Sequence, residues 1–80
     1  MFYNLSLSGK ILHSINEHKD KYNILAFIRE QHPPRGGWMY MYFKEMNILY
    51  GIFENNNIDF ISNLDILYDI QYILRGLHKL

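Results

Sequence analysis

The stretch Gly37–Glu54, GWMYMYFKEMNILYGIFE, decides how the rest of the chain is interpreted. It contains two runs of bulky apolar and aromatic residues, Trp38–Phe43 and Ile48–Phe53, separated by the short polar segment Lys44–Asn47. Aromatic and β-branched side chains of this kind fit the pleated, half-buried surface of a sheet. The two runs therefore predict a β-hairpin.

The alternation of side chains within the two runs predicts which face of the hairpin is buried. Odd positions carry side chains without a polar group, namely Met39, Met41, Phe43, Leu49 and Phe53. Even positions carry rings with a polar tip, namely Trp38, Tyr40, Tyr42 and Tyr50. Because successive residues of a strand point to opposite faces, the pattern predicts an apolar inner face and an aromatic outer face.

Before this hairpin, the sequence predicts a helix and a further strand. Gly9–Lys21 reads as a short helix with Ser8 as its N-cap. Tyr22–Gln31 reads as the first strand, because tyrosine, asparagine, isoleucine and phenylalanine are weak helix formers. An alternative joins this segment to the preceding helix, since Leu25, Ile28 and Arg29 also fit a helical spacing.

Two polar segments and a final helix complete the chain. The loop His32–Gly37 contains two prolines and two glycines, and Asn55–Asn57 is a polar turn. A helix is predicted from Asn63 to Leu77, with Ser62 as a fair N-cap. Its apolar stripe consists of Leu67, Ile70, Leu74 and Leu77, widened by Ile66 and Ile73. Its opposite side carries Asp65, Tyr68, Asp69 and Tyr72.

The predicted order of elements is α-β-β-β-α in a single domain, residues 1–80. A sheet with one apolar face must be covered, and the two amphipathic helices are the only cover that the chain offers. We therefore predict a two-layer α+β domain, a three-stranded antiparallel meander with both helices on one face. The aromatic face would remain open.

Composition limits the classes of function. The chain is 49% hydrophobic and 20% charged, it has no cysteine, and its formal net charge is zero. A neutral chain is a poor sequence-independent binder of nucleic acid. Neither a membrane span nor a signal peptide is predicted, and a cytoplasmic location is expected. Valine and threonine are absent whereas isoleucine, asparagine, tyrosine and lysine abound, which indicates an AT-rich genome of a bacterium, phage, plasmid or virus.

No motif for catalysis, for a metal or for a cofactor is present. His13 and His18 are five residues apart, which places them about 140° apart on a helix, a poor geometry for one metal ion. Asp65 and Asp69 share a helix face, but a catalytic pair of carboxylates also needs a cleft around it. We expect a protein that is not an enzyme and uses no cofactor.

The open aromatic face is the predicted site of function. Tyrosine and tryptophan are enriched in interface cores, because their rings bury a large area and keep a polar tip. The predicted partner-binding residues are Trp38, Tyr40, Tyr42, Tyr50, Arg35 and Tyr22. The partner is expected to be a protein, with a homodimer as another use of the same face. A phage or mobile-element inhibitor of a host protein, for example an anti-CRISPR protein, is one member of this class.

The predicted order of elements is similar to that of the double-stranded-RNA-binding domain. The resemblance covers most of the chain in topology and includes a loop, His32–Gly37, that contains a proline, a histidine and an arginine. It implies an alternative function in nucleic-acid binding, with aromatic stacking on bases. The family's lysine-rich start of the last helix corresponds here to Ser62–Asp65, whose carboxylate would repel phosphate.

Overall fold

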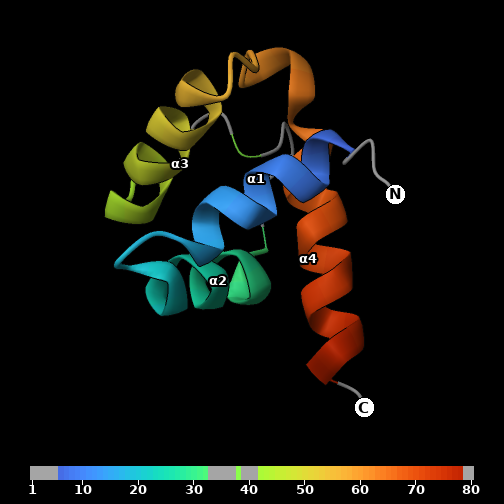
Figure 1. Cartoon of the computed structure of the whole chain (residues 1–80). Helices are drawn as coiled ribbons and strands as arrows, with labels where there is room; N and C mark the ends of the chain where they lie inside the picture. The colour runs from blue at the N-terminus through green and yellow to red at the C-terminus, as the bar shows by residue number, and fades with distance from the viewer. Residues whose placement is uncertain (1–5, 33–37, 39–41, 79–80) are drawn as a thin grey trace.

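Within the residues that the computed structural model describes, 6–32, 38 and 42–78, every regular element is a helix (Figure 1). The elements are α1 (Leu7–Asn16), α2 (Lys21–Glu30), α3 (Lys44–Asn55), the 3-10 helix η2 (Ile61–Asn63) and α4 (Asp65–His78). The structure is therefore an all-α globule, and the predicted α+β fold is wrong.

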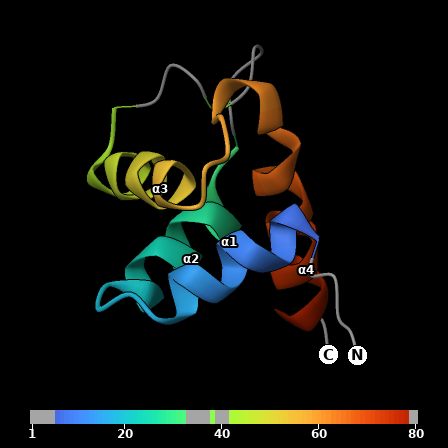
Figure 2. The same cartoon turned by 45° about the horizontal axis from the view of Figure 1, so that its top comes forward.

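The pair α1–α2 forms the centre of the arrangement. Residues 17–20 connect the two helices, and α2 returns beside α1. Helices α3 and α4 each contact both members of this pair, and they lie on either side of it in Figures 1 and 2. The core consequently lies between the central pair and its two flanking helices.

The segment predicted as a strand over Tyr22–Gln31 is helix α2. Its buried residues Ile24 and Ile28 are four apart, so they lie on the same helix face towards the core. Burial of this face outweighs the weak intrinsic helix propensity of the segment. The alternative of a continuous helix is also wrong, because residues 17–20 separate α1 from α2. Helix α1 starts earlier than predicted, since the Ser6 hydroxyl caps it by accepting a hydrogen bond from the Gly9 N–H at 3.1 Å.

The predicted hairpin is wrong for its second strand and its turn. Lys44 to Asn47 form the first turn of α3, and Ile48–Phe53 continues that helix. Met46, Leu49 and Phe53 are fully buried at the spacing i, i+3, i+7, which is the period of a helix face. Of the first predicted strand, residues 39–41 lie outside the described residues. Without a sheet in the described residues, the topological similarity to the double-stranded-RNA-binding domain does not hold.

The last predicted helix is confirmed, with a start at Asp65 instead of Asn63. Ile66, Leu67 and Ile70 are buried, as the stripe predicted. Ile73 differs, because 43% of it is exposed. The whole core of the described residues contains Ile11, Ile15, Ile24, Ile28, Trp38, Met46, Leu49, Ile52, Phe53, Ile58, Ile66, Leu67 and Ile70.

The C-terminal end of α2 is held by two side chains of α4. The Gln71 amide donates to the Ile28 carbonyl at 2.9 Å and to the Gln31 carbonyl at 2.7 Å. The Arg75 guanidinium donates to the Arg29 carbonyl at 3.0 Å and to the Gln31 carbonyl at 3.1 Å. The last carbonyls of a helix have no partner within it, so these bonds satisfy groups that α2 cannot satisfy itself. The arginine charge also complements the negative end of the α2 dipole.

Helix α3 ends in the predicted polar turn with Asn57 in the left-handed region, at φ 59°. The Ile58 N–H donates to the Phe53 carbonyl at 3.0 Å, and the Asn57 N–H donates to the Glu54 carbonyl at 3.0 Å. This pair of bonds is the Schellman motif, which usually brings an apolar residue after the turn onto the last helical turn. Ile58 and Phe53 are both buried, in agreement with that pattern.

Replacing Asn57 with glycine is expected to stabilise the protein by a few tenths of a kcal/mol, up to about 1 kcal/mol. Glycine adopts positive φ without steric cost, whereas alanine at this position should cost about 1 kcal/mol. Urea unfolding of both variants, followed by circular dichroism, measures the two changes. Equal stability of the glycine and alanine variants would show that this backbone conformation is not required.

Candidate functional site

The structure disperses the predicted partner-binding residues. Tyr22 on α2 and Tyr42 before α3 are 77% and 90% exposed, whereas Trp38 is fully buried. Tyr50 is half-buried on α3. Tyr40 and Arg35 lie outside the described residues. The described residues form no sheet, so no sheet face aligns these side chains. Their role in partner binding stays a prediction.

A different set of aromatic side chains does come together. Phe43, Phe27, Trp38 and Tyr68 form a continuous chain of ring contacts, which we call the aromatic row. Neighbouring ring centroids are 5.7 Å, 6.2 Å and 5.9 Å apart in that order. The interplanar angles of 57° to 68° are tilted or edge-to-face arrangements, which favourable aromatic pairs adopt. The row thereby links the start of α3, helix α2 and helix α4.

Both ends of the aromatic row reach the surface. Phe43 is 49% exposed and Tyr68 is 44% exposed, while Trp38 between them is fully buried. Tyr72, one turn beyond Tyr68 on α4, is 81% exposed. Tyr68 and Tyr72 were correctly predicted on the outer side of the last helix. The contact of Tyr68 with Trp38 was missed, because no local pattern brings together two residues that lie thirty positions apart in the sequence.

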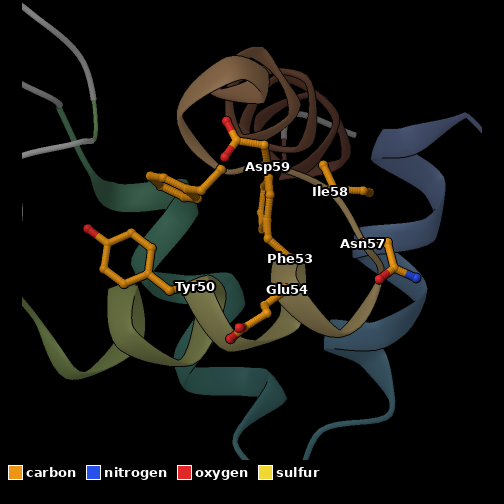
Figure 3. A pocket seen from close by; sticks show the side chains of 7 residues that line it. Tyr50, Phe53, Glu54, Asn57, Ile58 and Asp59 are labelled. Atoms are coloured by element: carbon orange, nitrogen blue, oxygen red, sulfur yellow. The ribbon is translucent and has the colours of Figure 1, made fainter.

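A second surface feature is a hollow of about 440 Å³ between α3 and the segment that leads into η2 (Figure 3). We call it the acidic hollow. It is lined by Tyr50, Phe53, Glu54, Asn57, Ile58, Asp59 and Phe60. The Schellman turn of α3 positions it, because that turn brings residues 57–60 back over the end of the helix.

Three aromatic rings contribute to the walls and floor of the acidic hollow. The Phe60 ring lies edge-on to Tyr50, with centroids 4.6 Å apart, and to Phe53, with centroids 5.0 Å apart. Phe53 is fully buried and lies beneath the hollow, whereas Tyr50 and Phe60 are half-exposed. These ring contacts fix the shape of the apolar part of the hollow.

Two exposed carboxylates complete the acidic hollow. Figure 3 shows Glu54 and Asp59 on opposite sides of Phe53. The backbone N–H of Ser62 donates to Asp59 Oδ2 at 2.9 Å. Hydrogen bonds from the Ser62 hydroxyl and from this N–H lower the pKa of the Asp59 carboxyl below its usual value. Asp59 therefore carries its negative charge throughout the neutral pH range.

The charges of the chain are segregated, although its formal net charge is zero. Residues 45–74 contain five carboxylates and no lysine, arginine or histidine; the carboxylates are Glu45, Glu54, Asp59, Asp65 and Asp69. This segment, which contains the residues that line the acidic hollow and the exposed side of α4, attracts cations and repels phosphate.

Other kinds of site receive no support from the residues at hand. No group of three side chains that could hold a metal ion occurs in the part of the chain that the structure describes. Among the same residues, no helix has the length and apolarity that crossing a bilayer requires. Comparisons with models of protein families, with curated proteins and with solved structures found no match. Fold and surface together define a small all-helical protein with exposed aromatic side chains.

Proposed function

We propose that this chain is a non-enzymatic binding protein whose target is another protein. The observation that carries the proposal is the aromatic row, whose exposed end at Tyr68 continues into Tyr72 on α4. Large rings with polar tips are the side chains that most often dominate the energy of protein interfaces. Because Trp38 in the core supports Tyr68, this end of the row is held in place before any partner binds, which lowers the entropy cost of association.

The charges next to the row favour a protein over a nucleic acid. Asp65 and Asp69 flank Tyr68 and Tyr72 on the exposed side of α4. Nucleic-acid binding draws most of its affinity from neutralised phosphates, and carboxylates at this position oppose it. The narrower predictions, inhibition of a host protein by a mobile element and formation of a homodimer, stay predictions, because no contact of the described residues bears on them.

A capture experiment with matched tyrosine variants tests the proposed function. The immobilised wild-type chain and the variants Tyr72→Ala and Tyr22→Ala are exposed to lysate of the source organism treated with nuclease. Both variants remove one exposed tyrosine, but only Tyr72 adjoins the aromatic row. We expect a protein that binds wild type and Tyr22→Ala, and that Tyr72→Ala binds at least about tenfold more weakly.

The salt dependence of the captured complex separates the alternatives. Binding through buried rings should persist when salt is raised, whereas binding through phosphates should fall steeply. If Tyr22→Ala weakens capture as much as Tyr72→Ala does, the result would support the partner-binding residues predicted from the sequence instead of the aromatic row. Capture that requires nucleic acid and disappears in salt would contradict the proposed function.

A further inference from the structure

The acidic hollow combines an apolar surface with a charged one. Its apolar surface comes from the rings of Tyr50 and Phe60, held at fixed angles over the buried Phe53. Its charged surface comes from Glu54 and Asp59, which lie on opposite sides of Phe53 in Figure 3. A ligand that satisfies both must present a cationic group that also tolerates contact with aromatic rings.

Among the residues that the structure describes, no cation pairs with the two carboxylates of the acidic hollow. The residues that line the acidic hollow include no lysine, arginine or histidine. Within the described residues, the ion pairs are formed by His13 with Glu17 and by Arg29 with Glu30, all of them outside the hollow. The negative charge of the hollow is therefore not neutralised by an ion pair of the described residues, and it lies within residues 45–74, which contain no lysine, arginine or histidine.

We propose that the acidic hollow receives an arginine side chain of a partner protein. The guanidinium is planar, stacks on aromatic rings and presents its N–H groups in a fork that suits carboxylates. It is also more weakly hydrated than the ammonium of lysine, so transfer from water into a ring-lined hollow costs it less. A volume of about 440 Å³ accommodates the long side chain together with part of its backbone. The hollow differs from the aromatic row, so this inference does not depend on the proposed function.

Binding of a single protected amino acid tests the proposal even while the partner is unidentified. Nα-acetyl-arginine amide is titrated into the ¹⁵N-labelled chain, and amide chemical shifts report where it binds. The neutral and nearly isosteric Nα-acetyl-citrulline amide tests the need for charge, and Nα-acetyl-lysine amide tests the need for the planar group. We expect the arginine derivative to shift the amides of residues 50–60 with a Kd on the order of 10 mM. The other two derivatives should bind at least about threefold more weakly.

Three variants assign the binding to the hollow. Glu54→Gln and Asp59→Asn should each weaken the arginine derivative about three- to fivefold. Asparagine keeps a side-chain oxygen that can accept the hydrogen bond from the Ser62 N–H, so Asp59→Asn keeps the local fold. The control Glu45→Gln removes the same charge from the same helix as Glu54→Gln, but outside the hollow, and should leave the Kd unchanged.

Specific results would overturn the proposal. Equally strong binding of citrulline or lysine would exclude recognition of a guanidinium. An equal effect of Glu45→Gln and Glu54→Gln, or shifts spread over Asp65 and Asp69 as well, would show only unspecific attraction of cations to the acidic segment 45–74. Absence of any shift at an arginine concentration of about 50 mM would exclude the site.

Discussion

Replacing Trp38 with alanine is expected to lower the free energy of unfolding by about 3–5 kcal/mol. Trp38 is fully buried and contacts the rings of Phe27 and Tyr68, so its removal leaves a large cavity between α2 and α4. A domain of this size has a total stability of about 4–12 kcal/mol. The variant should therefore lose a large share of its total stability, as circular dichroism at 222 nm during urea and thermal unfolding would show.

Two further substitutions make the test at Trp38 specific. Trp38→Phe keeps an aromatic ring and removes the indole N–H, which has no hydrogen-bond acceptor within the described structure. Its loss of stability should be clearly smaller than that of Trp38→Ala, because a buried unpaired donor is itself unfavourable. Tyr72→Ala removes an exposed ring and should change the stability by less than about 0.5 kcal/mol. A Trp38→Ala variant as stable as Tyr72→Ala would show that the tryptophan is not part of the core.

Trp38 also illustrates why the candidate site was predictable only in part. A tryptophan among tyrosines and methionines was assigned to an exposed sheet face, because the alternation of Gly37–Glu54 indicates strands. Its burial depends on contacts with α2 and α4, which lie on either side of it in the sequence. Local patterns carry no information on such contacts. By contrast, the exposure of Tyr68 and Tyr72 followed from the helical period alone and was predicted correctly.

The fold was predictable where the apolar period extends over several helical turns. In α4, Leu67, Ile70 and Leu74 repeat at helical spacing, and an alternating pattern does not fit them. In α3, Leu49 and Phe53 are four residues apart, so they share a face in a strand as well as in a helix. The same ambiguity holds for Ile24 and Ile28 in α2. At these positions the strand propensity of the side chains predicts strands. The segments are helices instead, because the helical arrangement buries their apolar faces in the core.

The second large effect is expected at Gln71, which is only 8% exposed and directs its side-chain amide to α2. Gln71→Leu preserves most of the volume, leaves the Ile28 carbonyl without its side-chain donor and leaves the Gln31 carbonyl with the donor from Arg75. A buried carbonyl left without a donor costs about 1–3 kcal/mol, so we expect the free energy of unfolding to fall by about 2 kcal/mol. Tyr72→Leu, the neighbouring exposed substitution, serves as the control and should be nearly neutral.

A double-mutant cycle with Arg75 distinguishes this mechanism from a general loss of packing. The Gln31 carbonyl accepts from Gln71 at 2.7 Å and from Arg75 at 3.1 Å, so either single substitution leaves it one donor. Only the variant with both Gln71→Leu and Arg75→Leu removes both. We therefore expect the double variant to lose more stability than the two single variants together, by about 0.5–1 kcal/mol. Additive losses in urea unfolding would mean that the two side chains act on α2 independently, and that the shared carbonyl does not couple α4 to the end of α2.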